Sequence, residues 1–187
     1  VIYMIGDGMG VAQVTEVIMS RQGDVNMQRA RHGGLVLTFS ANNRVTDSGA
    51  SGTALATGTK TNNGWIGIDT SRNELTTIME KAAANGMATG FIVTSYVTDA
   101  TPSAFYANVD SRWKNEEIAD QLTESGIDFF FGGGRDAFTK REDGRDLTAE
   151  LAAKGYTVID NTLHAETLTS GKIAGPFGSS TMPYVKD

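Results

Sequence analysis

The sequence predicts an α/β fold in which a mostly parallel central sheet carries helices on both faces, giving a three-layer α/β/α sandwich. Apolar segments of strand length alternate along the chain with segments of helical composition. The glycines, 22 in 187 residues, fall at the junctions of these segments and form no repeat. We expect a single domain or part of one, because no linker or low-complexity segment interrupts the pattern.

The expected strands are short apolar runs. The first, VIYMI (1–5), is continuously apolar, as is typical of a strand buried on both faces of a parallel sheet. The others lie at LVLTFS (35–40), ATGFIVTS (88–95), IDFFFGGG (127–134) and YTVID (156–160). Since the chain begins with such a strand and no leader precedes it, we expect a fragment and an incomplete sheet.

The expected helices alternate with these strands. Residues 11–21 carry apolar side chains at 11, 14, 17 and 18, which is a helical period. A small-residue helix follows Ser48 and ends near Gly58, and a turn with a short helix is expected at 98–109. Longer helices are expected at 73–86, 115–126 and 146–155. In such folds ligands bind beyond the carboxyl ends of the strands, so candidate site residues belong on the loops there.

Composition excludes several classes of function. The net charge of −6 disfavours non-specific binding to nucleic acid or to anionic membrane, since both depend on an excess of Lys and Arg. No apolar run approaches the roughly 20 residues that span a bilayer. The chain has no cysteine, which excludes disulfides, thiol catalysis and Cys-based zinc sites together.

Asp7 stands in the Gly-rich turn GDGMG (6–10), directly after the first expected strand. The turn is not a dinucleotide fingerprint, because G-x-G-x-x-G would need glycine where Val11 stands. A carboxylate at a strand end suits a metal ligand, since metal cations take Asp oxygens. The alternative is that Asp7 caps the helix that follows.

In the stretch VTDSGASGTA (45–54), Asp47 stands directly before Ser48, and the residues that follow have almost only small side chains. In one interpretation Ser48 is the N-cap of a helix that packs closely against its neighbours. In the other, Ser48 stands at a helix N-terminus that favours a phosphate or another anion.

A serine nucleophile needs a base, a lowered pKa or a metal ion. The two histidines, His32 and His164, lie in polar segments and are expected at the surface, so a Ser–His–Asp triad has no obvious partner. Metal activation of Ser48, with Asp7 as one ligand, fits the available residues better.

The third candidate segment is VTDATPSAFYANVDSRW (97–113), in which Asp99 and Thr101 offer two oxygen groups close together. Arg112 follows, and its fork of N–H donors matches the oxygens of phosphate or carboxylate. The alternative is a Thr-Pro helix start with Asp99 in a turn and Arg112 in a surface ion pair. Together the three segments supply metal ligands, a nucleophile and a charge donor, which phosphoryl transfer needs.

Several motifs, in this order, resemble the N-terminal part of the alkaline phosphatases. YMIGDGMG resembles the first metal loop of that family, VTDSGASGTALATG its serine signature, and TDATPSAFYANVDSR its magnesium and phosphate segment. FFFGGGRDAF and GPFGSSTMPY are also similar to the family. The resemblance covers essentially all of residues 1–187, which would then be the N-terminal portion of one catalytic domain.

The resemblance implies roles for the candidate residues. Ser48 would be the nucleophile that becomes phosphoserine and also a metal ligand, and Asp7 would bridge the second zinc and the magnesium. Arg112 would clamp the phosphate, and Asp47 would hold Arg112 in place.

Thr101 would bind magnesium through its hydroxyl, and Asp99 would bind a water molecule coordinated to magnesium. Many members have histidine at the latter position, so the aspartate favours magnesium over a third zinc. The family's remaining ligands for two Zn²⁺ and one Mg²⁺ would lie beyond this chain, which we therefore expect to be inactive alone.

The implied function is a metal-dependent phosphate monoester hydrolase that works at alkaline pH. Its partners would be small phosphate monoesters and inorganic phosphate, with no specific binding of nucleic acid and no membrane. The complete protein would be a homodimer, periplasmic or secreted. Two alternatives stay open: a phosphate-binding module without activity, and a related phosphodiesterase, sulfatase or phosphomutase, although the nucleophile contexts of those enzymes differ from VTDSGASGTA.

Overall fold

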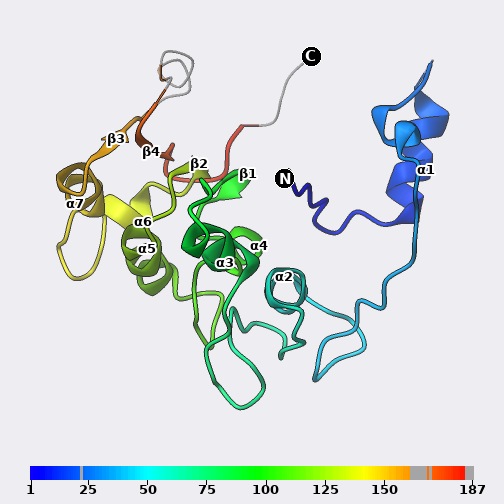
Figure 1. The fold of residues 1–187 in the computed structure, drawn as a ribbon, viewed down its shortest axis with the longest axis horizontal. Helices are drawn as coiled ribbons and strands as arrows, with labels where there is room; N and C mark the ends of the chain where they lie inside the picture. The colour runs from blue at the N-terminus through cyan, green and yellow to red at the C-terminus, as the bar shows by residue number, and fades with distance from the viewer. Residues whose placement is uncertain (22, 161–167, 169, 184–187) are drawn as a thin grey trace. The chain divides into compact units, whose positions relative to one another are not determined.

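A computed structural model describes the chain except for residues 22, 161–167, 169 and 184–187. The chain divides into two compact units, Val1–Thr38 and Phe39–Asp187, whose elements are labelled in Figure 1. Among the described residues, no helix is long and apolar enough to cross a membrane.

The first unit contains the helix α1 (Val11–Ser20) and the short 3-10 helix η1 (Asn26–Arg29). The helix begins after a turn at Asp7 and Gly8, where Gly8 has a φ of 67° that favours glycine. Its N-cap is Gly10, whose N–H donates to Gln13 Oε1 at 3.0 Å.

Two expected strands are wrong: residues 1–5 and 35–40 form no strand in the structure. Both runs have the apolar composition of strands, yet neither belongs to the sheet that the structure describes, and a strand exists only as part of a paired ladder. Their apolar side chains are largely exposed, with Ile2 at 90% and Leu35 at 100%.

The second unit contains helices and strands in an α/β arrangement, which confirms the predicted fold class. Its helices are α2 (Ser48–Thr57), α3 (Ile78–Ala84), α4 (Ala100–Ser103), α5 (Asn115–Glu124), α6 (Asp136–Thr139) and α7 (Leu147–Ala153). Its strands are β1 (Gly90–Tyr96), β2 (Phe129–Gly133), β3 (Tyr156–Val158) and β4 (Lys172–Pro176).

All pairings within the sheet are parallel, and the strand order is β1-β2-β4-β3. The sequence predicts β1, β2 and β3 but not β4, which inserts between β2 and β3.

Helix α3 begins at Ile78 rather than near residue 73, because Thr77 caps it: Thr77 Oγ1 accepts from Glu80 N–H at 3.1 Å, and Glu80 Oε2 accepts from Thr77 N–H at 2.7 Å.

The core of the second unit lies on one face of this sheet. Phe91, Phe130 and Ala174 are in register on that face, and the Phe91 and Phe130 rings stack at 5.9 Å. The same cluster includes buried side chains of α5, α6 and α7, among them Leu122, Phe138 and Leu151.

The opposite face of the sheet carries Phe129 and Phe131, which are half-buried, and Ile92, which is 71% exposed. Phe131 stacks on Phe177 with the ring centroids 6.0 Å apart.

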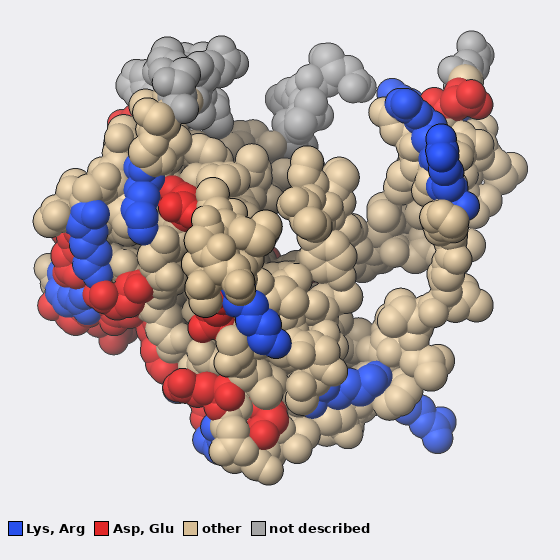
Figure 2. All heavy atoms as spheres, in the orientation of Figure 1, with Lys and Arg blue, Asp and Glu red and all other residues tan. Residues whose placement is uncertain are grey.

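A network of ion pairs links α5 to the segment that joins α6 and α7. The Arg141 side chain, only 2% exposed, donates to Asp143 at 2.6 Å and to Asp120 at 3.3 Å. Arg145 donates to Asp120 and to Glu150. Figure 2 shows acidic and basic side chains intermixed on the side of the second unit that carries α5 and α7.

Candidate functional site

The start of helix α2 presents the first candidate residues. Asp47, not Ser48, is the N-cap: its backbone is extended, and its Oδ1 accepts from Ala50 N–H at 2.9 Å. The interpretation of Ser48 as an N-cap is therefore wrong, because the side chain that accepts from the first turn of the helix is the Asp47 carboxylate. Ser48 is the first helical residue and is half-buried at the positive end of the helix dipole.

The carboxylate of Asp47 connects three parts of the second unit. Besides the helix cap, its Oδ2 accepts from Gly64 N–H at 3.0 Å and from Arg112 Nη1 at 3.1 Å. Partial burial raises the pKa of this carboxyl, but the backbone hydrogen bonds from Ala50 and Gly64 and the contact with Arg112 outweigh it and lower the pKa below its ordinary value of 3.8. Asp47 is therefore ionised at neutral pH.

Arg112 lies between two carboxylates. Its Nη1 donates to Asp47 Oδ2 and its Nη2 to Asp99 Oδ1, each at 3.1 Å, and its side chain is 19% exposed. A guanidinium carries more N–H donors than these two ion pairs use. The structure thus brings together three of the predicted site residues in a partly buried cluster, rather than leaving Arg112 in a loose surface pair.

Thr101 lies in α4, two residues after Asp99, which is the N-cap of that helix. Helix α4 lies against α2: a Cβ built at Gly52 would meet Ala104 Cβ at 2.9 Å and Thr101 O at 3.4 Å. Only the absence of a side chain at Gly52 allows this approach. The small residues of α2 therefore bring the segment that carries Ser48 next to the segment that carries Thr101.

Asp7 belongs to the first unit, where it stands in the turn before α1. It does not cap the helix, because Gly10 holds the N-cap position. His32 is exposed, as expected, and His164 lies outside the described residues.

The chemistry of a metal site can be tested against these residues. The candidate donors Asp7, Ser48 and Thr101 are all oxygen donors, which suit magnesium better than zinc. The part of the chain that the structure describes contains no group of at least 3 His, Cys, Asp or Glu side chains that could hold a metal ion.

Sequence reasoning missed Asn63 and Gly64, which lie between α2 and α3 and contact Asp47 directly. Asn63 Oδ1 accepts from Asp47 N–H at 3.2 Å, and Gly64 O accepts from Arg112 N–H at 2.7 Å. The Asn-Gly dipeptide is a turn signal, and Gly64 has the expected positive φ of 82°. The dipeptide gives no indication of which distant residues the turn contacts.

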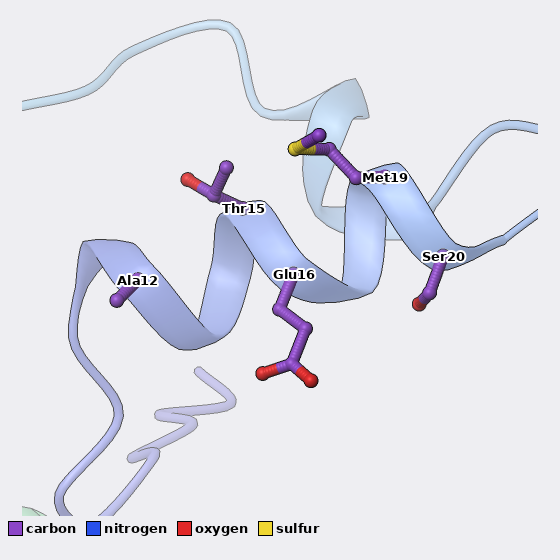
Figure 3. Close-up of a pocket in the computed structure, with 5 residues that line it drawn as sticks. All are labelled: Ala12, Thr15, Glu16, Met19 and Ser20. Carbon is purple, nitrogen blue, oxygen red and sulfur yellow. The ribbon is translucent and has the colours of Figure 1, made fainter.

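A shallow hollow on α1 is lined by Ala12, Thr15, Glu16, Met19 and Ser20. All five side chains come from one helix, with Glu16 pointing away from Thr15 and Met19 (Figure 3). It is an open helix surface with a single carboxylate, and we assign no site to it.

Comparisons with known proteins agree on one family. The family model of alkaline phosphatase matches residues 1–185. The chain is 34% identical to alkaline phosphatase 4 of Bacillus subtilis, covering 100% of this chain and 43% of that protein. It is 33% identical to streptomycin-6-phosphate phosphatase of Streptomyces griseus, covering 98% of this chain and 48% of that protein.

Solved structures give the same answer. The alkaline phosphatase of the Antarctic bacterium TAB5 superposes with a TM-score of 0.90 at 36% identity, covering 95% of this chain and 52% of that one. A variant of that enzyme with a histidine replaced by aspartate, and with Mg bound, matches with a TM-score of 0.90 at 37% identity over the same shares.

The chain thus spans about half the length of the relatives it matches, with 43% of one and 52% of another covered. The match itself extends over nearly the whole chain and includes the motifs that carry the candidate site. The chain belongs to the alkaline phosphatase family.

Proposed function

We propose that the protein is a metal-dependent phosphate monoester hydrolase in which Ser48 attacks phosphorus and becomes phosphoserine. The observation that carries the proposal is the place of Ser48 at the first residue of α2, next to an aspartate whose carboxylate pairs with Arg112. A helix N-terminus and a guanidinium both attract phosphate oxygens. Membership of the alkaline phosphatase family supports the same chemistry.

The reaction proceeds in two displacements. In the first, Ser48 Oγ forms a bond to phosphorus while the bond from phosphorus to the alcohol oxygen breaks, and the serine proton leaves with the alcohol. In the second, water attacks the phosphoserine, the Oγ–P bond breaks, and Ser48 regains a proton as phosphate departs. Both steps pass through a transition state with negative charge on the equatorial oxygens.

Arg112 binds those equatorial oxygens in this mechanism. Its guanidinium is held by Asp47 and Asp99 before substrate arrives. Arg112 is therefore already oriented when the substrate binds. Its partial burial strengthens the interaction with phosphate, because water screens it less there.

Two zinc ions and one magnesium, when bound, would lower the pKa of the attacking hydroxyl and water. Asp7, Ser48 and Thr101 would supply oxygen ligands, and Asp99 would bind a water molecule on magnesium. A His-to-Asp variant of the TAB5 enzyme that holds Mg supports an aspartate at a magnesium site. Zinc would need further ligands besides these, because a catalytic zinc normally takes about three protein ligands.

The physiological setting is proposed from the family. Small phosphate monoesters are the expected substrates, alkaline pH the working condition, and the periplasm or the outside of the cell the location. The complete protein is expected to be a homodimer.

Phosphoserine mapping tests the proposal. The protein expressed from its complete gene is incubated with a monoester labelled in the phosphoryl group, quenched in acid and digested. We expect the label on Ser48, its loss in Ser48→Ala, and its retention in Ser51→Ala, which removes a hydroxyl from the same helix turn. Label on any other residue would overturn the assignment of the nucleophile.

A phosphate-binding module without turnover is the second candidate. The observation in its favour is that the described residues bring Asp47, Asp99 and Arg112 together, so that a preoriented guanidinium with further N–H donors could bind phosphate. Zinc content and phosphate release measured on one preparation separate the two: zinc with turnover indicates the enzyme, and phosphate binding with neither indicates the module.

A further inference from the structure

The loop 62–68, between α2 and α3, contacts both members of the ion pair formed by Asp47 and Arg112. Gly64 donates its N–H to Asp47 Oδ2 at 3.0 Å and accepts from Arg112 N–H at 2.7 Å. One residue of this loop therefore contacts both partners through its backbone alone. The contact depends on glycine, because the φ of 82° at Gly64 strains any other residue.

The loop is anchored on the Arg112 side by a two-way bridge. Ile66 and Val109 exchange backbone hydrogen bonds, N–H to O, at 2.9 Å in both directions. Both side chains are buried. The approach of the loop to the segment that carries Arg112 is thus fixed by the core and does not depend on the ion pair.

On the Asp47 side the loop acts through the carboxamide of Asn63. Its Oδ1 accepts from Asp47 N–H at 3.2 Å, and its Nδ2 donates to Val45 O at 2.9 Å. The backbone of Asn63 in turn donates to Asn42 Oδ1 at 2.9 Å. A carboxamide suits this place because one neighbour needs an acceptor and the other a donor, and a carboxamide carries the two on separate atoms.

We propose that Asn63 is a positioning residue: its carboxamide fixes the backbone of Asp47 and thereby the direction in which Asp47 holds Arg112. The physical reason lies in the order of the contacts. The Asp47 carboxylate orients Arg112 through the hydrogen bond from Nη1. The orientation of that carboxylate depends in turn on the backbone of Asp47, whose N–H donates to Asn63. Without Asn63, the Asp47 N–H loses its acceptor and the chain before the helix loses its link to the loop.

This inference rests on the proposed function, and its test compares Asn63→Ala in two backgrounds. In the otherwise unchanged protein, expressed from its complete gene, we expect kcat/KM for a phosphate monoester and the affinity for inorganic phosphate to fall about 10- to 100-fold. In an Arg112→Ala background the same change should cost less than about 3-fold, because the group that Asn63 positions is already gone.

Asn73→Ala is the matched control. Asn73 lies in the same connection between α2 and α3, and its carboxamide bonds Asp69 at 2.9 Å with no link to Asp47 or Arg112. It should leave both measurements unchanged. Equal losses from Asn63→Ala in both backgrounds, or a matching loss in Asn73→Ala, would overturn the inference.

Asn63→Leu carries the same comparison if Asn63→Ala does not fold, since it keeps the bulk of the side chain but has neither the acceptor for Asp47 N–H nor the donor to Val45 O. A protein that forms no phosphoserine would refute the proposed function alone. The inference would then be decided by the affinities for inorganic phosphate, measured by calorimetry in the same set of variants.

Discussion

Asp47 and Arg112, 65 positions apart in the sequence, meet through a 3.1 Å contact between Oδ2 and Nη1. The same Asp47 carboxylate caps the helix that begins with Ser48. A single side chain therefore ties the start of that helix to the arginine, and changes to Asp47 should affect both helix stability and anion binding.

Two substitutions at Asp47 should separate these effects. Asparagine is a good N-cap, so Asp47→Asn should keep the helix start but remove the charge that holds Arg112, weakening phosphate binding with little change in thermal stability. Asp47→Ala should weaken phosphate binding too and also lower the free energy of unfolding by about 1 kcal/mol through loss of the cap. Thermal melts and phosphate calorimetry on both variants check this. Equal melting temperatures for the two would contradict the capping role.

Asp99→His should shift the metal preference of the complete protein from magnesium toward zinc, because imidazole suits zinc and hard oxygen ligands suit magnesium. Elemental analysis after dialysis against both metals gives the result. Asp99→Asn serves as the control, since it also loses the charge that faces Arg112 but offers no imidazole. Unchanged metal content in Asp99→His would remove Asp99 from the site.

Residues 1–187 alone should show no zinc-dependent phosphatase activity above background. A catalytic zinc normally takes about three protein ligands, and the described residues hold no such group. The check is an assay of a chromogenic phosphate monoester with zinc and magnesium added, repeated after mixing with any further part of the gene product. Turnover by residues 1–187 alone would show that the site is complete within them.

Arg141→Met should destabilise the second unit by about 1–3 kcal/mol, since the almost fully buried guanidinium holds Asp120 and Asp143 together. Arg72→Met is the matched control: Arg72 pairs with Asp110 at 2.7 Å, but its side chain is 64% exposed. Exposed pairs contribute about 0–1 kcal/mol, so the control should stay close to the unmodified protein in urea unfolding. Similar losses for the two variants would refute the structural role of Arg141.

The network also predicts a dependence of stability on pH. The hydrogen bond from Arg141 lowers the pKa of Asp143 from 3.8 to about 2. A carboxyl with a lowered pKa stabilises the folded state fully above its unfolded pKa, and that contribution disappears as pH falls through the folded pKa. The difference in melting temperature between the unmodified protein and Asp143→Asn should therefore be constant above about pH 5 and shrink as the pH falls toward 2. A difference that stays constant to pH 2 would contradict the assignment.

Local features of the fold could be predicted from the sequence because they depend on neighbouring residues. The α2 helix is expected to follow Ser48 and to end near Gly58, and it does end there with a φ of 78° at Gly58, although its N-cap is Asp47 rather than Ser48. The strands β1 and β2 are apolar runs, and β2 ends in glycines.

Features that depend on distant partners could not be predicted. Strand β4 is a short run with Gly175 and Pro176, and it is a strand because β2 and β3 pair with it on both sides. The run at residues 1–5 shows the reverse case, since it has strand composition but is not a strand of the sheet. Of the site, the pairing of Asp47 with Arg112 followed only from the family resemblance, and the role of Asn63 has no sequence signal beyond a turn.

The position of β4 in the sheet also constrains how the protein is made. Strands β1, β2 and β3 leave the ribosome first, but β3 has no place beside β2 until β4 arrives to separate them. The half-finished sheet thus keeps one edge of β2 unpaired throughout synthesis of the intervening segment, and such nascent edges invite association between chains. The yield of soluble protein should therefore be sensitive to any change that delays or prevents the pairing of β4 with β2.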